Sequence, residues 1–203
     1  MIFLNYKTHR KIIPFALVVI YSFIFTTAIY PQNQPEWKIF KSADSPLTSN
    51  IITSISVDTF NNKWITCGGG LFKISGDDFT DFSNWTEIAN LPANVSFVQA
   101  DKNGNVWMGN GLQATGLIKY DGNAFTVFNT QNSPIPYDNI SGIAIDLNNN
   151  IWIMDGMEGV TAQIYLVEFD GNNNWFQLPG NFGYQTRGDL AGIDSSGNIW
   201  TAS

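Results

Sequence analysis

The chain has 203 residues, with 10 Lys and Arg against 17 Asp and Glu, which gives a formal charge of −7. The length suits one domain with a hydrophobic core, and the few, scattered basic residues exclude a nucleic-acid-binding surface, which needs clustered Lys and Arg. The only histidine is His9 and the only cysteine is Cys67, which excludes an internal disulfide and, beyond residue 30, serine triads and His–Cys zinc sites.

Residues 1–30 are predicted to be a secretory signal peptide. Three basic residues precede the uncharged, mostly apolar stretch Ile12–Tyr30, and small residues allow cleavage after Ala28. The alternative is an uncleaved N-terminal anchor, because about 20 apolar residues can span a bilayer. We therefore expect an exported protein, located in the periplasm, at the cell surface or outside the cell. It would touch the membrane only through this segment if the segment is not cleaved.

Beyond residue 30 the chain repeats one frame, in which an Asp precedes a Trp by six residues. The four copies are DTFNNKW (58–64), DKNGNVW (101–107), DLNNNIW (146–152) and DSSGNIW (194–200). Their tryptophans are 43, 45 and 48 residues apart. A period of this length, with several short strands in each unit, indicates a β-propeller or a solenoid.

Each unit is predicted to contain four antiparallel strands, here called A to D, from hydrophobic alternation and turn residues. The Asp frame is the hairpin turn between strands A and B, where Gly or Asn can adopt the positive φ that a tight turn needs. The expected ranges are 51–57, 95–100, 140–145 and 190–193 for A; 63–66, 105–109 and 150–154 for B; 70–74, 116–120 and 165–169 for C; and 79–82, 125–128 and 175–178 for D.

The sequence therefore predicts an all-β fold, a β-propeller of four-stranded antiparallel blades across residues 31–203. Its expected parts are a lone outer strand (37–50), three complete blades (51–94, 95–139 and 140–189) and a partial terminal blade (190–203). The lone strand looks like a strand D that lacks its own A to C, and the partial blade lacks strand C. We expect an incomplete ring, with truncation of a longer chain favoured, and self-association through exposed sheet edges.

The blade sequence resembles the two-component regulator propeller repeat. The resemblance rests on GNVWMG, GLIKYDG, FTVFN and NSPIP between Asn103 and Pro136, with SADSPL at 42–47 similar to the last of these, and it extends over about residues 37–203. It implies a periplasmic ligand-sensing propeller of the kind found in Bacteroides-type hybrid sensors, often with seven blades. The rest of a longer propeller or sensor chain is then an expected partner.

The repeated Asp frame begins like a calcium-binding loop, but no Glu follows at the twelfth position. We expect each Asp to accept N–H bonds within its own turn, and each Trp to pack between neighbouring sheets. Cys67 lacks a histidine that could activate it, so it is interpreted as a small filler residue with Gly109 and Met154 as its equivalents.

The composition does not exclude carboxylate chemistry. Asp155 and Glu158 could supply an acid and a base from one loop, whereas Asp77 and Asp78 are expected to be solvated in a turn. We expect no catalytic residues, no metal and no cofactor.

In an up-and-down blade the A–B and C–D turns share one face, and the B–C and D–A connections share the other. The second set is longer and differs between units, and binding sites tend to lie on such loops. Residues 154–163 and 179–189 would contribute most. The candidate ligand-binding residues, chosen because aromatic rings stack on sugars or peptides and Arg binds carboxylates, are Trp85, Tyr137, Met157, Phe182, Tyr184 and Arg187.

These features favour an exported module that binds or senses a glycan or other polar ligand. Two alternatives stay open. One is a structural or adhesive surface domain. The other is a propeller-scaffold lyase, similar in repeat style to the lyases that inactivate streptogramin antibiotics, whose chemistry is associated with a histidine that residues 31–203 lack.

Overall fold

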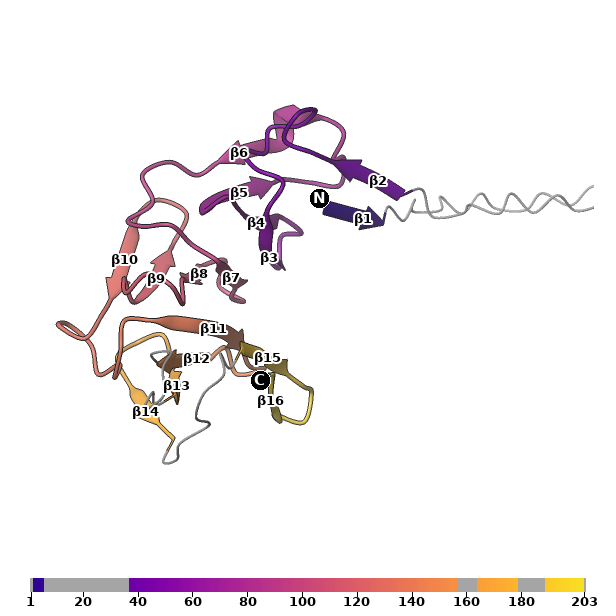
Figure 1. Ribbon diagram of the computed structural model, residues 1–203. Coiled ribbons are helices and arrows are strands. Elements are labelled where there is room, and N and C mark those ends of the chain that lie inside the picture. The colour runs from indigo at the N-terminus through magenta and orange to yellow at the C-terminus, as the bar shows by residue number, and fades with distance from the viewer. Residues whose placement is uncertain (1, 6–36, 157–163, 179–188, 203) are drawn as a thin grey trace, which may run out of the picture.

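The computed structural model describes residues 2–5, 37–156, 164–178 and 189–202. These residues form three four-stranded antiparallel sheets and two two-stranded sheets. The sheets stand side by side along an arc, with β3, β7, β11 and β15 on its inner side (Figure 1). This radial arrangement of four-stranded sheets is a β-propeller, so the predicted fold class is confirmed.

Each four-stranded sheet is one blade, and its strands follow chain order from the inside outwards. Blade 1 contains β3 (Ile52–Val57), β4 (Lys63–Cys67), β5 (Gly70–Ile74) and β6 (Trp85–Glu87). Blade 2 contains β7 (Phe97–Ala100), β8 (Val106–Gly109), β9 (Leu117–Tyr120) and β10 (Phe125–Phe128). Blade 3 contains β11 (Ile140–Ile145), β12 (Ile151–Gly156), β13 (Ile164–Phe169) and β14 (Trp175–Gln177). A partial blade contains β15 (Asp189–Ile193) and β16 (Ile199–Ala202), and β1 (Ile2–Asn5) pairs with β2 (Trp37–Phe40).

The outer strand of blade 1 is not where the sequence predicts it. Residues 79–82 lead into a single 3₁₀ turn, Phe82–Asn84, in which the Asp81 side chain accepts the backbone N–H of Ser83. The strand follows at Trp85–Glu87. Trp85 pairs with Ile74 and buries its ring, with 7% exposed. The alternating pattern of 79–82 looked like a strand, but burial of the larger indole ring decides the register.

The Asp frame forms the same hydrogen-bonded turn in all four copies. Asp58 Oδ1 accepts the backbone N–H groups of Phe60 and Asn62 at 2.9 and 2.8 Å. Its Oδ2 accepts Asn62 Nδ2 at 2.7 Å and Trp64 Nε1 at 2.9 Å. The three other frames repeat these four bonds. The expected turn is confirmed, and the bond from the Trp indole to the Asp explains why the two residues recur six apart.

The fourth residue of each frame has a positive φ. It is Asn61 (64°), Gly104 (84°), Asn149 (71°) and Gly197 (81°). Only Gly and Asn adopt this left-handed conformation at small cost. The expected turn chemistry is therefore confirmed at all four positions.

The blades are held together by apolar clusters that lie between neighbouring sheets. Trp64, 4% exposed, packs against residues of blade 2 such as Val98 and Met108. Trp107, 1% exposed, packs against Phe169 and Ile153 of blade 3. The expected role of these tryptophans as packing residues between sheets is thus confirmed for the complete blades.

Residues 37–50 have the conformation of an outer strand and the connection after it. Lys41 N–H donates to Asp44 Oδ1, Ser45 Oγ donates to Lys41 O, and Ser42 N–H donates to Asn50 Oδ1. The connection after β10 repeats these three bonds between residues 88 positions later. Asn129 N–H donates to Asn132 Oδ1, Ser133 Oγ donates to Asn129 O, and Thr130 N–H donates to Asp138 Oδ1. The lone strand therefore has the hydrogen bonds of a strand D and the connection after it, and its neighbour in the sheet is β1.

Of the predicted signal segment, residues 2–5 form β1, which pairs with β2, and residues 1 and 6–30 lie outside the described residues. Within the part of the chain that the structure describes, no helix is long and apolar enough to cross a membrane.

Candidate functional site

Hydrogen bonds between loops define the two faces of the arc. One face, which we call the turn face, carries the A–B and C–D turns. There, Asn61 of an A–B turn donates to Asp77 of a C–D turn. Two neighbouring A–B turns are also joined, because Lys102 N–H donates to Asn149 Oδ1 at 2.7 Å. On the other, the loop face, a B–C loop meets a D–A connection where Gly116 N–H donates to Asp138 O at 2.8 Å. The expected division of the connections between two faces is confirmed.

The turn face offers no spare ligand atoms in its Asp frames, because each carboxylate already accepts four hydrogen bonds. Burial raises the pKa of Asp58 and Asp146, but the bonds from Asn and Trp side chains and from backbone N–H groups outweigh it and lower both pKa values. The bond from Asn198, with others, lowers the pKa of Asp194 to about 2. Among the described residues, no group of three or more His, Cys, Asp or Glu could hold a metal ion.

A groove of about 400 Å³ lies on the turn face between blades 1 and 2. Phe60, 72% exposed, stands at it, and Lys73 Nζ lies 5.4 Å from the centre of the Trp64 ring. Blade 2 repeats the Lys-over-Trp contact with Lys119 and Trp107 at the same distance. This repetition favours a packing role for the contact, since a ligand platform is needed only once.

The loop face carries a different feature, located three residues after the frame Trp of each complete blade, at or next to the end of the second strand. The residues there are Cys67, Asn110 and Asp155, which are 0%, 8% and 0% exposed. Each binds the connection that precedes its blade. Cys67 Sγ donates to Ser49 O at 3.1 Å, Asn110 Nδ2 donates to Asn94 O at 3.2 Å, and Asp155 Oδ2 accepts Tyr137 N–H at 2.9 Å. We call these three residues the strand-end positions.

The strand-end positions correct the sequence alignment of Cys67. Its equivalents are Asn110 and Asp155, not Gly109 and Met154, because each follows its frame Trp by three residues. In the sheets, Cys67 pairs with Ile52 as Asp155 pairs with Ile140. Cys67 is buried and bonded to a backbone carbonyl, so its interpretation as a small filler residue stands. With the alignment corrected by one residue, the Asp155 carboxyl occupies the same position as the neutral side chains of Cys67 and Asn110.

Asp155 is the only strand-end residue that carries a charge. Its Oδ1 is buried and has no hydrogen-bond partner. Burial raises the pKa of Asp155 to about 7, the N–H of Tyr137 opposes this, and the negative charge of Asp138 adds to it. A buried carboxyl group with an unused oxygen and a near-neutral pKa is a typical feature of a functional site.

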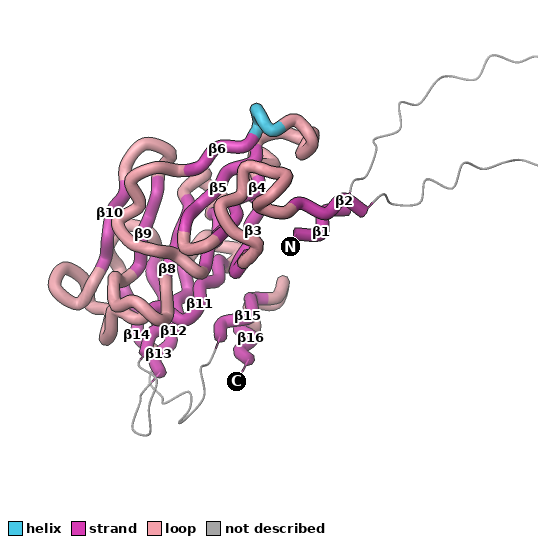
Figure 2. Tube along the Cα trace, turned by 45° about the horizontal axis from the view of Figure 1, so that its top comes forward, coloured by secondary structure: helices cyan, strands magenta, loops and turns pink. Residues whose placement is uncertain are grey.

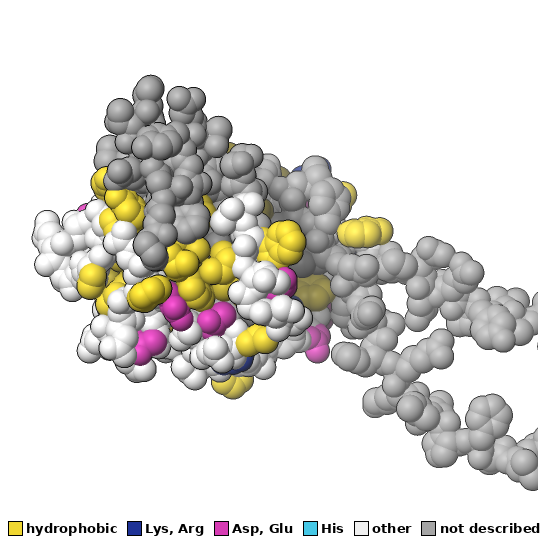
Figure 3. Space-filling view, turned by 90° about the horizontal axis from the view of Figure 1, so that it is seen from below, with side chains coloured by type: hydrophobic (Ala, Val, Ile, Leu, Met, Phe, Trp, Pro, Cys, Tyr) yellow, Lys and Arg dark blue, Asp and Glu magenta, His cyan; other side chains and the backbone are white. Residues whose placement is uncertain are grey.

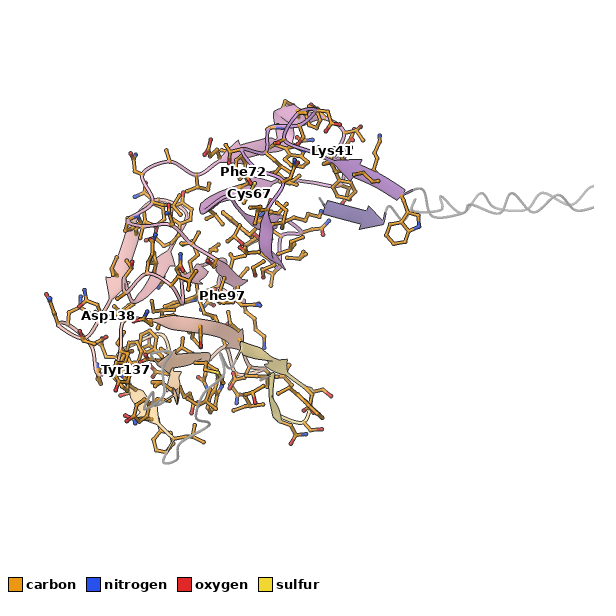
Figure 4. All side chains as sticks on the ribbon, viewed as in Figure 1. Lys41, Cys67, Phe72, Phe97, Tyr137 and Asp138 are labelled. Carbon is orange, nitrogen blue, oxygen red and sulfur yellow. The ribbon has the colours of Figure 1, made fainter. Side chains whose placement is uncertain are left out.

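The surroundings of Asp155 are aromatic and polar. Tyr137 and Tyr165 lie with their ring centres 5.9 Å apart and their planes tilted by 33°. Asp138 holds the turn after β10 through the backbone N–H and hydroxyl of Thr130 at 2.7 and 3.2 Å. Figure 4 shows Tyr137 and Asp138 in the connection that enters blade 3, next to the start of β11. The connection is thus fixed by bonds to blade 3 and to its own turn.

The six predicted ligand-binding residues have different outcomes. Tyr137 is half-buried and lies beside Asp155. Trp85 is not on a variable loop but in β6, where its Nε1 donates to Phe79 O at 3.1 Å and its ring lies 5.4 Å from that of Phe40. Buried in the core, it is not available to a ligand. Met157, Phe182, Tyr184 and Arg187 lie outside the described residues, as does most of 154–163 and 179–189.

The two predicted carboxylate pairs, Asp155 with Glu158 and Asp77 with Asp78, also have different outcomes. Glu158 lies outside the described residues, so its distance from Asp155 is not described. Asp77 is exposed and lies 3.7 Å from Lys63 Nζ, and exposed Asp78 accepts bonds from Thr80, which matches their expected place in a solvated turn. The sequence drew attention to Asp155 only as half of a pair. Its signal as a single residue is an Asp at the end of an otherwise apolar strand.

No protein-family model matches the chain, and no curated protein matches it. Several solved structures match its fold. Streptogramin B lyase does so with a TM-score of 0.53 and 18% identity, over 74% of this chain and 47% of that chain. A catalytically inactive virginiamycin B lyase from Staphylococcus aureus with quinupristin has a TM-score of 0.52 and 19% identity, over 74% and 48%.

The extracellular domain of a hybrid two-component system from B. thetaiotaomicron also matches, with a TM-score of 0.52 and 19% identity, over 81% of this chain and 22% of that one. The chain therefore spans about half the length of the two lyase chains and less than a quarter of the sensor chain. At these identities the likeness shows the fold and nothing narrower. The chain has the β-propeller fold, which lyases and extracellular sensor domains share.

Proposed function

We propose that the protein is an exported module that binds or senses a glycan or another polar ligand on the loop face of blade 3. The observation that carries this is Asp155. Each strand-end residue makes a hydrogen bond to the connection that precedes its blade. In blades 1 and 2 the uncharged thiol of Cys67 and the uncharged amide of Asn110 make this bond. A buried carboxyl group with an unpartnered oxygen destabilises the fold, and a neutral side chain could make the same hydrogen bond without this cost. Ligand binding is a function that would retain it.

The chemistry around Asp155 suits a polar ligand with hydroxyl groups. A carboxyl oxygen can accept a bond from a hydroxyl and, when protonated, donate one. The tyrosine pair of Tyr137 and Tyr165 supplies apolar ring surface with polar tips, which is how proteins commonly contact sugars. Because Asp155 holds the backbone of Tyr137, a ligand that bonds to Oδ1 would also act on the connection between blades 2 and 3.

Binding accounts for this arrangement better than catalysis. Acid–base hydrolysis of a glycosidic bond uses two carboxyl groups that act on opposite sides of the bond. The described carboxylate whose charge acts on Asp155 is Asp138, and both of its oxygens already accept bonds from Thr130. We therefore assign no reaction to the site. An exported location is supported by the leader sequence and is in keeping with the extracellular domain among the structural matches.

A ligand screen with three variants tests the proposal. Oligosaccharides and small polar compounds are screened by thermal shift against the full chain, and each hit is measured by calorimetry on Asp155→Asn, Tyr137→Ala and Phe60→Ala. We expect both loop-face substitutions to weaken binding by about tenfold or more, while Phe60→Ala, at the groove on the turn face, leaves it unchanged. Binding that is lost only in Phe60→Ala would move the site to the turn face, and no hit at all would favour a structural or adhesive domain.

A further inference from the structure

The groove on the turn face between blades 1 and 2 combines aromatic walls with polar groups. The two blades stand side by side in both views of the chain (Figures 1 and 2). Blade 1 contributes Trp64, Lys73 and Thr86, which are cross-strand neighbours on one side of the sheet. Blade 2 contributes Tyr120, whose ring lies 6.2 Å from that of Trp64. The volume of the groove, about 400 Å³, is within the range of small-molecule sites.

Two aromatic rings at the groove offer surface for stacking. The ring of Tyr120 is held in place, because it stacks on Phe125 at 4.7 Å and its hydroxyl donates to Gly122 O at 2.8 Å. Phe60 is largely exposed, and its Cε2 lies 3.1 Å from the position that a Cβ on Gly104 would take. The ring of Phe60 therefore lies against the A–B turn of blade 2. Aromatic surface with a few polar groups nearby is typical of a ligand site.

The groove also contains a lysine without an acidic partner. Lys73 is half-buried with its Nζ over the Trp64 ring, and within the described part of the chain it forms no ion pair, whereas Lys63 forms one with Asp77. Asp58 also lines the groove, but each of its two oxygens already accepts two hydrogen bonds. The ammonium group of Lys73 is thus the charge that a ligand in the groove would meet.

The contact of a lysine with a tryptophan recurs in blade 2, but the surroundings of the lysine do not. Two positions after it, blade 1 has Ser75 and blade 2 has Asp121. Backbone N–H groups and the charge of Lys119 lower the pKa of Asp121, so the two charges in blade 2 balance. Blade 3 has Glu168 and Asp170 at the two positions. The same place is therefore positive in blade 1, balanced in blade 2 and negative in blade 3.

The exposed aromatic ring is also special to this junction. The third residue of the Asp frame is Phe60 in blade 1, and it is Asn103, Asn148 and Ser196 in the other copies. On the side of the molecule seen in Figure 3, acidic side chains are more prominent than basic ones, in keeping with 17 acidic and 10 basic residues. A ring and an unbalanced lysine thus coincide once, in a chain whose overall charge is negative. Packing repeats with the blade, whereas a ligand site is needed once.

We propose that the groove between blades 1 and 2 binds an acidic sugar, a uronic acid unit of an oligosaccharide or polysaccharide. Its carboxylate pairs with Lys73, and its ring lies on Phe60 and Tyr120. The hydroxyls of Ser75 and Thr86, which also line the groove, donate to or accept from the sugar hydroxyls. A neutral sugar would leave Lys73 without a counter-charge, and a small inorganic anion would not use the rings.

Calorimetry on the full chain tests the proposal. The probes are trisaccharides of galacturonate, glucuronate and mannuronate, with the trisaccharides of galactose, glucose and mannose as their neutral counterparts. We expect at least one acidic trisaccharide to bind at least about tenfold more tightly than its neutral counterpart, since a hydrogen bond to a charged group is worth this much. Its affinity should fall as sodium chloride is added, because salt screens the ion pair.

Matched substitutions in two blades separate binding from packing. Lys73→Met, which removes the charge and keeps a long side chain, should weaken binding by about tenfold or more. Ser75→Asp, which gives blade 1 the balanced charges of blade 2, and Phe60→Ala should weaken it as well. Lys119→Met makes the same change in the repeated contact of blade 2 and should leave the affinity unchanged. Circular dichroism checks that each variant is folded.

The groove and the loop face are separate sites, and Asp155→Asn tells them apart. Binding of the acidic sugar should be the same in Asp155→Asn as in the wild type, whereas Phe60→Ala stays the control for a neutral ligand of the loop face. An acidic sugar lost in Asp155→Asn and kept in Lys73→Met would overturn the groove and support the loop face.

Three other results would also overturn the proposal. One is that none of the acidic trisaccharides binds, or that their neutral counterparts bind equally well. Another is an equal loss of affinity in Lys73→Met and Lys119→Met. The third is binding of a short peptide with an aromatic C-terminal residue in the absence of sugar binding, which would assign Lys73 to a peptide carboxylate.

Discussion

Replacing Asp155 with Asn should stabilise the protein at neutral and higher pH and have little effect in acid. The pKa of Asp155 is raised to about 7 in the folded chain, against 3.8 for an ordinary Asp, so the unfolded chain loses this proton at lower pH than the folded chain does. The free energy of unfolding of the wild type therefore falls as pH rises from about 4 to 7. At about 1.4 kcal/mol for each pH unit, this carboxyl costs up to about 3 kcal/mol between pH 5 and pH 8.

Asn has nearly the same shape and cannot ionise, so it escapes this cost. Urea unfolding followed by tryptophan fluorescence at pH 5, 6, 7 and 8 gives the difference in free energy of unfolding between Asp155→Asn and the wild type. We expect the difference to grow with pH up to about 7 and then level off. Asp194→Asn is the control, because its pKa is lowered to about 2 and the carboxylate stays ionised throughout this range. If the difference in free energy of unfolding for Asp155→Asn changes as little with pH as it does for the control, the description of Asp155 as a buried, unpartnered carboxyl is wrong.

Three further predictions concern the fold. Trp107→Ala should destabilise the chain by about 3–5 kcal/mol, measured by urea unfolding, because it empties a buried junction between blades and removes the bond to Asp101. Gly116→Ala should cost at least about 3 kcal/mol, since its Cβ would lie 2.1 Å from Phe128 O, whereas Gly122→Ala, with a similar positive φ but open space, should cost about 1 kcal/mol; equal costs would contradict the clash. Gly104→Asn should lower the melting temperature less than Gly104→Val, because Asn already occupies the same left-handed position at Asn61 and Asn149.

The repeat predicted most of the fold because the hydrogen bonds that form each turn join residues close together in the sequence. An Asp that accepts bonds from its own turn and from a Trp six residues later fixes the hairpin, and the hairpin fixes the strands on either side. The outer strand of blade 1 escaped prediction because two short segments fit the alternating pattern. Only pairing with Ile74 and burial of Trp85 decide between them, and both are contacts with distant parts of the sheet.

The candidate site was harder to predict than the fold. Tyr137 was found from its place on a variable connection, but the residue that binds its backbone, Asp155, was seen only as a loop carboxylate. Its equivalence to Cys67 and Asn110 can be counted from the frame Trp, but the bond that each of the three makes to the preceding connection cannot be seen in the sequence. Burial and an unused oxygen are properties of the packed structure, which hydrophobic patterns do not contain.

The most direct test of the site is a carbon-13 NMR titration of the Asp155 side-chain carboxyl, assigned by comparison with Asp155→Asn. In the free protein we predict a midpoint near pH 7, and with a ligand from the screen we predict a clear shift of that midpoint, because the ligand gives Oδ1 a partner. A midpoint near the ordinary 3.8 that no ligand moves would contradict the assignment of this carboxyl to a binding site.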